Sequence, residues 1–142
     1  MILLSVYLVT LNEERRLPFA LQKAALVADE IIVVDSGSID ATEEIAKKFG
    51  AEFIYNPWES IGHQVSFAEK CCSNKWVLRL DADEVLSDEL VEEILQIKKN
   101  PEYDGYKLRI GDVYPGRDLP LRWVKHYKLI RLYNRDAMEM SG

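Results

Sequence analysis

The chain has 142 residues and a formal net charge of −6, and 48% of its residues are hydrophobic and 30% charged. That length and composition fit one globular domain with a sizeable core. The acidic balance argues against a nucleic-acid-binding surface, which normally carries a basic stripe. The apolar N-terminal segment lacks a basic stretch, and no apolar run approaches the roughly 18 residues of a membrane span. We therefore expect neither a signal peptide nor a transmembrane helix.

Apolar runs alternate with helical patterns as far as Lys99. Strands are predicted at Ile2–Val9, Glu30–Val34, Ala51–Tyr55 and Lys75–Leu80, and helices at Glu13–Val27, Ala41–Phe49, Gly62–Cys72 and Asp88–Lys99. Asp40 and Glu43 have the spacing of a capping box, and Gly50 is a typical helix end. Strands separated by helices predict an α/β fold with a mostly parallel central sheet, and continuous apolar strands predict helices on both of its faces.

The pattern changes after Pro101. Tyr106–Ile110 and Lys128–Tyr133 alternate apolar and polar residues, which predicts two half-exposed strands. The residues between them, Gly111–His126, are expected to form a long loop of the kind that often carries function. The last residues give no stop signal, so we expect the natural protein to continue beyond Gly142.

Polar residues follow three of the predicted strands directly. The carboxyl ends of parallel strands meet at one edge of a sheet, where open α/β sheets bind ligands. We therefore expect these side chains to converge there: Thr10, Asn12, Glu13, Asp35, Asp81 and Asp83. The Asp-x-Asp spacing suits one divalent cation whose shell is completed by phosphates.

Each of these residues also has a structural explanation. The acidic run after Leu80 is equally compatible with a turn in which Ser87 or Asp88 caps the next helix. Asp35 is also typical of a strand-end turn, and Gly37 of a positive φ. The glycine-rich motifs of dinucleotide sites and P-loops are absent, so a cation at Asp83 would have to neutralise any phosphates.

Other reactive or aromatic side chains give weaker signals. Cys71 and Cys72 are adjacent, which favours reduced thiols on a buried helix side and a cytoplasmic location. His63 and His126 lack metal-ligand spacing and are expected on the surface or in loops. Trp58 and Trp123 are expected in loops beside the site, either as a platform for a sugar ring or as core filling; both alternatives stay open.

Three segments together resemble a known family. Ser5–Glu14 (SVYLVTLNEE), Val33–Thr42 (VVDSGSIDAT) and Trp76–Glu84 (WVLRLDADE) are similar to the signature segments of family 2 glycosyltransferases, which have the GT-A fold. The nearest branch is that of the lipopolysaccharide-core β-1,4-glucosyltransferases. The resemblance implies one GT-A-like domain over residues 1–142. Residues 1–100 would be its nucleotide-binding half, and residues 101–142 the incomplete start of an acceptor-side half.

The resemblance also implies site roles. Asp83 would be the ligand of Mg²⁺ or Mn²⁺ beside the diphosphate. The implied nucleotide-sugar-binding residues are Thr10, Asn12 and Glu13 beside the nucleotide, Asp35 at the uracil ring, Asp81 near the ribose and donor sugar, and Gly62 and Gln64 over the base. The chain departs from the family where Val65 and Ser66 replace a frequent basic residue and asparagine, and where Ile39 replaces a frequent threonine.

The activity implied is inverting transfer of a sugar from a nucleotide-diphosphate donor, a UDP-sugar, to a glycan or glycolipid in lipopolysaccharide and cell-envelope biosynthesis. It would take place in the cytoplasm, with peripheral association at the inner face of the membrane. The required base is expected beyond Gly142, with Asp112 and Asp118 as in-chain candidates. A basic group is expected to face the acceptor or the diphosphate, or else to be a solvated face guarding an edge strand: Arg122, Lys125, Lys128 and Arg131.

Two other functions remain open. One is a nucleotidyltransferase, although the glycine-rich basic loop that such enzymes carry after the first strand is missing. The other is a nucleotide-sugar-binding module without turnover. The sequence assigns neither the donor sugar, nor the acceptor, nor the oligomeric state.

Overall fold

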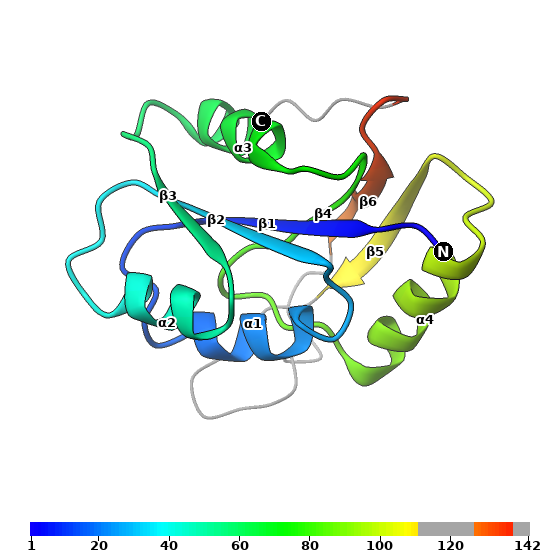
Figure 1. Ribbon diagram of the computed structural model, residues 1–142, viewed down its shortest axis with the longest axis horizontal. Helices are drawn as coiled ribbons and strands as arrows, with labels where there is room; N and C mark the ends of the chain where they lie inside the picture. Colours follow the sequence, from blue (N-terminus) through cyan, green and yellow to red (C-terminus); the bar gives the residue numbers. More distant parts are fainter. Residues whose placement is uncertain (111–126, 138–142) are drawn as a thin grey trace.

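A computed structural model describes residues 1–110 and 127–137 of the chain (Figure 1). The elements are β1 (Leu4–Thr10), α1 (Leu17–Ala24), β2 (Glu30–Asp35), α2 (Thr42–Lys48), β3 (Glu52–Tyr55), α3 (Ile61–Cys71), β4 (Trp76–Arg79), α4 (Asp88–Lys99), β5 (Gly105–Ile110) and β6 (Tyr127–Asn134). They form one six-stranded sheet of order β3-β2-β1-β4-β6-β5. The first four strands are parallel, whereas β6 runs antiparallel to both β4 and β5.

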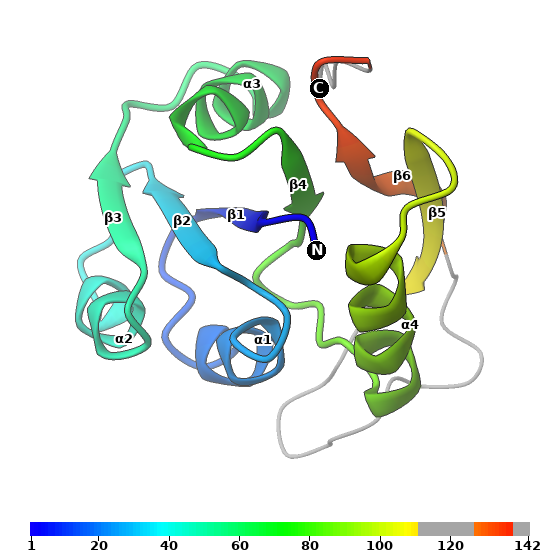
Figure 2. The ribbon, with the colours of Figure 1, turned by 45° about the vertical axis from the view of Figure 1, so that its right-hand side comes forward.

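Helices cover both faces of the sheet, as the continuous apolar strands predict. Helices α1 and α2 lie on one face and α3 on the other, and α4 lies beside β5 (Figures 1 and 2). Alternate residues of β1 serve the two faces: Leu8 packs with the α1 side chain Leu21, whereas Tyr7 packs with Val65 of α3. The central strands β1, β2 and β4 are therefore covered on both faces, which leaves the ends of the strands as the place for a ligand.

Helix ends show where local signals succeed and fail. Ser87 caps α4, since its hydroxyl accepts the N–H of Leu90 at 3.0 Å, and Gly50 ends α2 with φ +81°. The predicted capping box is wrong. Helix α2 begins after Ala41 without a side-chain cap. Asp40 instead accepts the N–H of Thr42 at 2.9 Å, while Glu43 pairs with Lys47.

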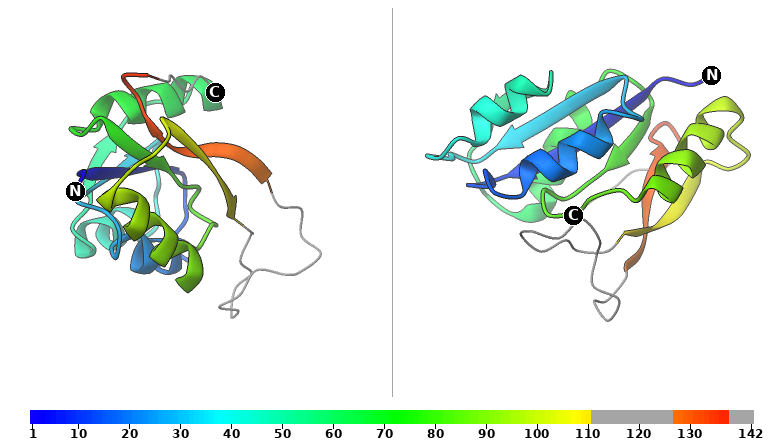
Figure 3. Two further views of the ribbon diagram at one scale, coloured as in Figure 1. Left: turned by 90° about the vertical axis from the view of Figure 1, so that its right-hand side faces the viewer. Right: turned by 90° about the horizontal axis from the view of Figure 1, so that it is seen from below.

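The predicted helix Glu13–Val27 is shorter than expected at both ends, because residues 14–16 and 25–27 form turns. The first of these turns bonds to the loop after β2 through Glu14. The prediction that Lys128–Tyr133 is a half-exposed strand is also wrong for its last three residues. Strand β6 lies between β4 and β5, not at the edge (Figure 3). Arg131, Leu132 and Tyr133 are therefore all buried. The expected loop Gly111–His126 lies outside the described residues.

A buried cation fastens α4 to the sheet. Lys98 is almost fully covered, and its Nζ donates to the carbonyl of Val27 and to Asp29 Oδ2, both at 2.8 Å. The same Asp29 oxygen accepts the N–H of Leu4 at 2.8 Å. Burial acts to raise the pKa of Asp29, but the hydrogen bonds from Lys98 and Leu4 and the Lys98 charge outweigh it and lower the pKa.

We predict that Asp29→Asn lowers the free energy of unfolding by about 1–3 kcal/mol at pH 7, because Lys98 keeps its buried charge without a counter-charge. A carboxyl with a lowered folded-state pKa stabilises the protein above its unfolded pKa, and that stabilisation is lost as the pH falls through the folded pKa. The difference in the free energy of unfolding between the parent and Asp29→Asn should therefore become smaller below about pH 4. Urea unfolding followed by tryptophan fluorescence measures both effects.

The control is Asp136→Asn. It removes the 3.9 Å pair with Lys75, in which both side chains are more than 60% exposed. This change should alter the free energy of unfolding by less than about 0.5 kcal/mol. Equal losses in the two variants would contradict the assignment of Asp29 as a structural counter-charge.

Candidate functional site

The carboxyl ends of β1 and β2 are aligned at one edge of the sheet. Their register places Thr10 opposite Asp35, and Thr10 Oγ1 donates to Asp35 Oδ1 at 2.7 Å. Strand β4 ends earlier, with Arg79 opposite Tyr7. The acidic turn from Asp81 to Glu84 therefore follows at the same edge, as the sequence predicts.

Asp35 is a buried carboxylate held by four donors. Its Oδ1 accepts from the hydroxyls of Thr10 and Ser38, and its Oδ2 accepts from the N–H groups of Gly37 and Ser38, at 2.6–2.8 Å. Burial acts to raise the pKa of Asp35, but these donors outweigh it and lower the pKa. All four lone-pair positions are occupied. The structural alternative from the sequence, a strand-end turn with Gly37 at φ +123°, is thus present here.

The loops after β1 and β2 are locked together through Asn12. Its N–H donates to the hydroxyl of Ser38 at 2.7 Å, and its side-chain oxygen accepts the N–H of Ile39 at 2.9 Å. Asn12 has φ +52°, a left-handed conformation that asparagine tolerates better than most residues. The next residue, Glu13, donates its N–H to Thr42 Oγ1 at 2.9 Å. These bonds give the two loops a single fixed shape.

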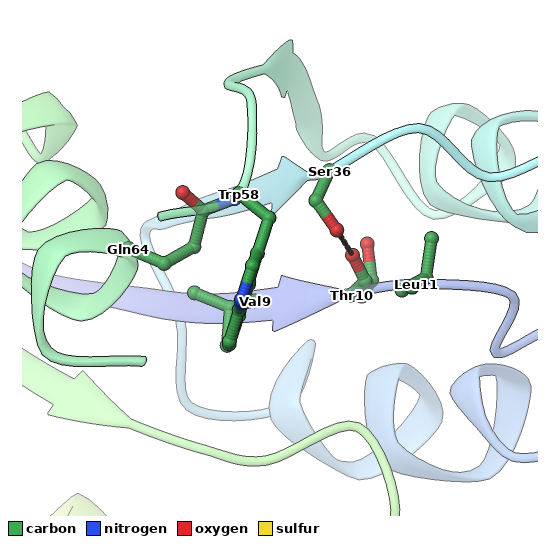
Figure 4. Close-up of a pocket in the computed structure, with 6 residues that line it drawn as sticks. All are labelled: Val9, Thr10, Leu11, Ser36, Trp58 and Gln64. Atoms are coloured by element: carbon green, nitrogen blue, oxygen red, sulfur yellow. Dashed lines mark hydrogen bonds between the residues drawn. The ribbon is translucent and has the colours of Figure 1, made fainter. Parts of the chain in front are cut away.

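A pocket of about 310 Å³ opens between the ends of β1 and β2 and the start of α3. Its lining residues are Val9, Thr10, Leu11, Ser36, Trp58 and Gln64 (Figure 4). Trp58 comes from the connection before α3 and lines the pocket together with Val9, and the Ser36 hydroxyl points toward Thr10. Trp58 thus lies in a loop beside the site, as predicted, and because it is 56% exposed the core-filling alternative is wrong. The volume is at the lower end for small-molecule sites.

Gln64 forms a rigid wall of this pocket. Its amide exchanges two hydrogen bonds with Asn56: Oε1 accepts from the Asn56 side chain at 2.8 Å, and Nε2 donates to the Asn56 carbonyl at 3.0 Å. The Gln64 amide is therefore already engaged within the protein. Gly62 lies in the first turn of the same helix, α3, which Ser60 caps.

The acidic turn after β4 divides into outward and inward carboxylates. The side chains of Asp81 and Asp83 are 39% and 36% exposed, whereas Glu84 is 2% exposed. The carboxylate of Glu84 accepts hydrogen bonds from both terminal nitrogens of Arg131, at 2.8 and 3.2 Å. Burial and the neighbouring Asp81 charge raise the pKa of Glu84 to about 7, against the lowering effect of Arg131. Of these three carboxylates, those of Asp81 and Asp83 are therefore the ones that reach solvent.

The turn also meets the connection before α1. Arg16 Nη1 lies 3.8 Å from Asp83 Oδ2. Glu13, near both, has its pKa raised, chiefly by burial, while the Arg16 charge lowers it and the charges of Asp83 and Asp40 raise it. The side chains of Glu13, Arg16 and Asp83 therefore share one electrostatic environment, as the predicted convergence requires.

We tested whether these side chains suit a divalent cation. Over residues 1–110 and 127–137, no three His, Cys, Asp or Glu side chains are grouped to hold a metal by themselves. Asp83 and Asp81 nevertheless supply hard carboxylate oxygens. Mg²⁺ is commonly bound by one or two carboxylates together with substrate phosphates and water. The donor set therefore fits a cation that arrives with a phosphorylated ligand.

Arg131 does not lie on a solvated basic face. It is 4% exposed and lies against Glu84, and its Nη2 is 3.7 Å from Asp81 Oδ2. The expected solvated face is therefore wrong for Arg131, and its guanidinium is bound within the protein and not exposed to an acceptor or the diphosphate. Several other predicted residues lie outside the described part of the chain: Asp112, Asp118, Arg122, Lys125, Trp123 and His126. For Lys128, only the backbone, in β6, is described.

The remaining sequence expectations are met in part. His63 is half-exposed on α3 and pairs with Glu59. Both cysteines are free thiols, and Cys72 is buried. Arg16, Ser36 and Ser38 were not among the predicted site residues. All three belong to the polar runs that follow β1 and β2, which was the available signal.

The sheet order and the helices on its two faces define an α/β domain of the GT-A type. The chain belongs to glycosyltransferase family 2, whose family model, described as glycosyl transferase family 2, matches residues 5–139. An uncharacterised glycosyltransferase of Rickettsia typhi is 41% identical over 135 residues, which cover 93% of this chain and 46% of that protein. The lipopolysaccharide core biosynthesis glycosyltransferase LpsC of Rhizobium meliloti is 32% identical, covering 83% of this chain and 50% of LpsC. The chain thus spans about half the length of the curated relatives it matches.

Solved structures show the same fold. Staphylococcus aureus TarS has a TM-score of 0.62 at 23% identity, covering 84% of this chain and 38% of TarS. Glucosyl-3-phosphoglycerate synthase from Mycobacterium tuberculosis, in complex with Mn²⁺, UDP and phosphoglyceric acid, has a TM-score of 0.60 at 26% identity, covering 75% of this chain and 42% of that one. The predicted α/β GT-A fold is confirmed. No helix in the described residues is long and apolar enough to cross a membrane.

We predict that Asp35→Asn lowers the free energy of unfolding by about 2–4 kcal/mol, because the amide group turns a donor toward donors and removes the buried negative charge. The matched control in the same loop is Ile39→Thr, at a side chain that is 93% exposed. It should change stability by less than about 0.5 kcal/mol. Urea unfolding of both variants measures this, and unchanged stability of Asp35→Asn would refute the four-donor arrangement.

Proposed function

We propose that this chain transfers a sugar from a UDP-sugar to a hydroxyl of a glycan or glycolipid, with inversion and with the help of Mg²⁺ or Mn²⁺. The observation that carries the proposal is the position of the Trp58 pocket and the Asp81–Asp83 turn at one edge of the sheet. The synthase from Mycobacterium tuberculosis crystallises with UDP and Mn²⁺, and TarS with UDP-GlcNAc. The similarity to LpsC, a lipopolysaccharide core biosynthesis glycosyltransferase, supports a lipopolysaccharide precursor as the acceptor.

The pocket suits a nucleobase. Val9, Leu11 and the Trp58 indole provide apolar surface for the face of a ring, and aromatic side chains stack on bases whatever their identity. The Ser36 hydroxyl makes only a long 3.5 Å bond to the Thr10 carbonyl, so it is available to a ligand. For Asp35 to accept a uracil N–H, the hydroxyl of Thr10 or Ser38 must first turn away from it. Gly62 and Gln64 would close the pocket from α3.

The diphosphate would extend from this pocket toward the acidic turn. When bound, a divalent cation supplies Lewis-acid neutralisation of the departing diphosphate. Asp83 would hold the cation, and Asp81 would orient the ribose and donor sugar. Arg16, 3.8 Å from Asp83, offers a fixed positive charge beside the same group. Asn12 and Glu13 would lie beside the nucleotide, because hydrogen bonds hold the loop after β1 against the loop after β2.

The acceptor side belongs to the later part of the chain. On this proposal residues 1–100 supply the nucleotide-binding half of a single domain over 1–142, and residues 101–142 begin the acceptor half. Asp112 and Asp118 are the in-chain candidates for the base that removes the acceptor proton. Arg122, Lys125 and Lys128 are the candidates for contact with an anionic acceptor. The domain would work in the cytoplasm, at the inner face of the membrane where a glycolipid acceptor is reached.

We predict that Mn²⁺ tightens the binding of UDP to the parent, and that Asp83→Asn removes most of this effect, because a metal ligand is worth roughly tenfold or more in affinity. Calorimetry with and without Mn²⁺ measures it. The control is Asp136→Asn, whose carboxylate pairs with Lys75 at the opposite edge of the sheet and should leave the metal effect intact.

Turnover separates the remaining alternatives. Release of UDP from a UDP-sugar only when an acceptor is present indicates a transferase. Tight UDP binding without release indicates a binding module, and release of pyrophosphate from a nucleoside triphosphate and a sugar phosphate indicates a nucleotidyltransferase. Binding of UDP to the parent that ignores Mn²⁺ would count against the assignment of Asp83.

A second prediction concerns the pocket. Trp58→Ala should weaken UDP binding by about 1–3 kcal/mol, roughly 5- to 150-fold, through loss of base stacking. Trp58→Phe keeps an aromatic face and should recover most of the affinity. The Mn²⁺ effect should be equal in both variants, since Trp58 lies at the base and not at the diphosphate. If Trp58→Ala binds UDP as tightly as the parent does, the base does not occupy this pocket.

A further inference from the structure

We propose that Arg131 and Glu84 form a buried clamp that holds the turn Asp81–Glu84 in the shape that presents Asp81 and Asp83 to the diphosphate. Arg131 is thus a positioning residue that touches no substrate itself. The inference rests on the proposed function, because it assigns the acidic turn to the diphosphate. It gives a role to the strand β6, which reaches the site from the later part of the chain.

The position of Arg131 follows from the sheet register. Strand β6 runs antiparallel to β4, with Leu132 opposite Leu78. Arg131 therefore lies level with Arg79, the last residue of β4, at the point where the acidic turn begins. Its Nη1 also donates to the Arg79 carbonyl at 3.4 Å. Figures 2 and 3 show β6 lying directly beside β4.

Glu84 connects this guanidinium to the backbone of the turn. Its Oε1 accepts both the Arg131 Nη1 donor and the N–H of Asp81, each at 2.8 Å, and its Oε2 accepts Arg131 Nη2 at 3.2 Å. The N–H of Glu84 in turn donates to the Asp81 carbonyl at 2.9 Å. The turn is thus closed by two bonds between Asp81 and Glu84, and the bidentate pair fixes the carboxylate that makes one of them.

The clamp also acts on the Asp81 side chain. Arg131 Nη2 lies 3.7 Å from Asp81 Oδ2, and Arg79 Nε lies 3.8 Å from Asp81 Oδ1. Two guanidinium groups from adjacent strands therefore lie near the two oxygens of one carboxylate. This restricts the rotation of Asp81 before any ligand binds, which is the condition for a preorganised site.

Stability alone does not account for such a pair. The desolvation of two buried charges offsets much of their attraction, and well-packed apolar residues are often as stabilising. The described contacts of the Arg131 guanidinium all go to Arg79, Asp81 and Glu84, at or beside the acidic turn. Arg135, at the other end of β6, offers a comparison: its guanidinium donates to the carbonyls of Glu69 and Cys72, both at 2.6 Å, at the end of α3.

The test compares Arg131→Met, Arg131→Lys and Glu84→Gln with the matched control Arg135→Met. The readout is the dissociation constant of UDP, measured by calorimetry with and without Mn²⁺. Loss of a residue that orients a metal ligand typically costs about 10- to 100-fold in metal affinity. Arg131→Met should therefore lose most of the Mn²⁺-dependent affinity and keep the metal-free affinity within about twofold. Arg131→Lys should recover part of the loss, since one cationic donor remains.

Amide hydrogen exchange provides a readout that needs neither metal nor nucleotide. The Asp81 N–H should exchange faster in Arg131→Met and Glu84→Gln, because its acceptor is no longer held. It should exchange at the parental rate in Arg135→Met, even though that variant is also destabilised. If Arg131→Met does not fold, Arg131→Lys and Glu84→Gln carry the same comparison.

The outcomes are distinguishable. A parent that binds no UDP with Mn²⁺ refutes the proposed function, and parental exchange at Asp81 in Glu84→Gln then refutes the clamp as well. A parent that binds normally, together with folded Arg131 variants that keep the full Mn²⁺ effect, overturns the clamp alone. Equal loss of the Mn²⁺ effect in Arg135→Met also overturns it, because the effect would then follow stability.

Discussion

Asp35 keeps its charge inside the protein because four donors surround its carboxylate, and the rest of the site is arranged around that group. The hydroxyl of Thr10 reaches it from β1, and Ser38 reaches it from the loop after β2 through both its N–H and its hydroxyl. Ser38 in turn accepts the N–H of Asn12, whose side chain holds Ile39. One buried charge thereby determines the shape of both loops that border the pocket.

The acidic turn after β4 follows the same rule. A buried carboxylate, Glu84, is fully engaged and shapes the backbone, while the half-exposed Asp81 and Asp83 remain directed to the surface. Burial distinguishes the two kinds of carboxylate in this turn, since a buried charge needs close hydrogen-bonded partners, whereas an exposed one is also stabilised by water. Under the proposed function, Glu84 shapes the turn and Asp81 and Asp83 meet the ligand.

The sequence was sufficient for the order of the first four strands and for the edge at which their polar ends gather. Alternation of apolar runs and helices predicted the four parallel strands, and parallel topology brought Thr10, Asp35 and Asp83 to one edge. The sequence was insufficient wherever a residue or strand contacts a partner that lies far away in the chain. Nothing local indicates that Arg131 meets Glu84, 47 positions earlier, or that β6 is inserted between β4 and β5. A strand with alternating polar residues was therefore predicted to be half-exposed, although its arginine is paired and buried.

The capping box failed for a related reason. Asp40 and Glu43 have the right spacing, but Asp40 also accepts the N–H of Glu14 from the facing loop, and Glu43 lies within reach of Lys47. Tertiary contacts thus outweighed a local signal that is worth only about 1 kcal/mol. The same competition explains why Asp35, which resembles a base-binding residue by its position, has its hydrogen-bonding capacity filled by the protein itself.

Under the proposed function, the exposed carboxylates of Asp81 and Asp83 link the binding of the cation to the binding of the nucleotide. Asp81 and Asp83 cannot complete the shell of a cation alone, so most of its remaining ligands must come from the diphosphate and water. If the diphosphate raises the affinity for the cation, the cation must raise the affinity for the nucleotide by the same factor, because binding free energies are linked. The strength of that linkage depends on how well the two carboxylates are oriented before binding. The backbone turn that Glu84 closes is therefore the element through which β6 influences donor binding.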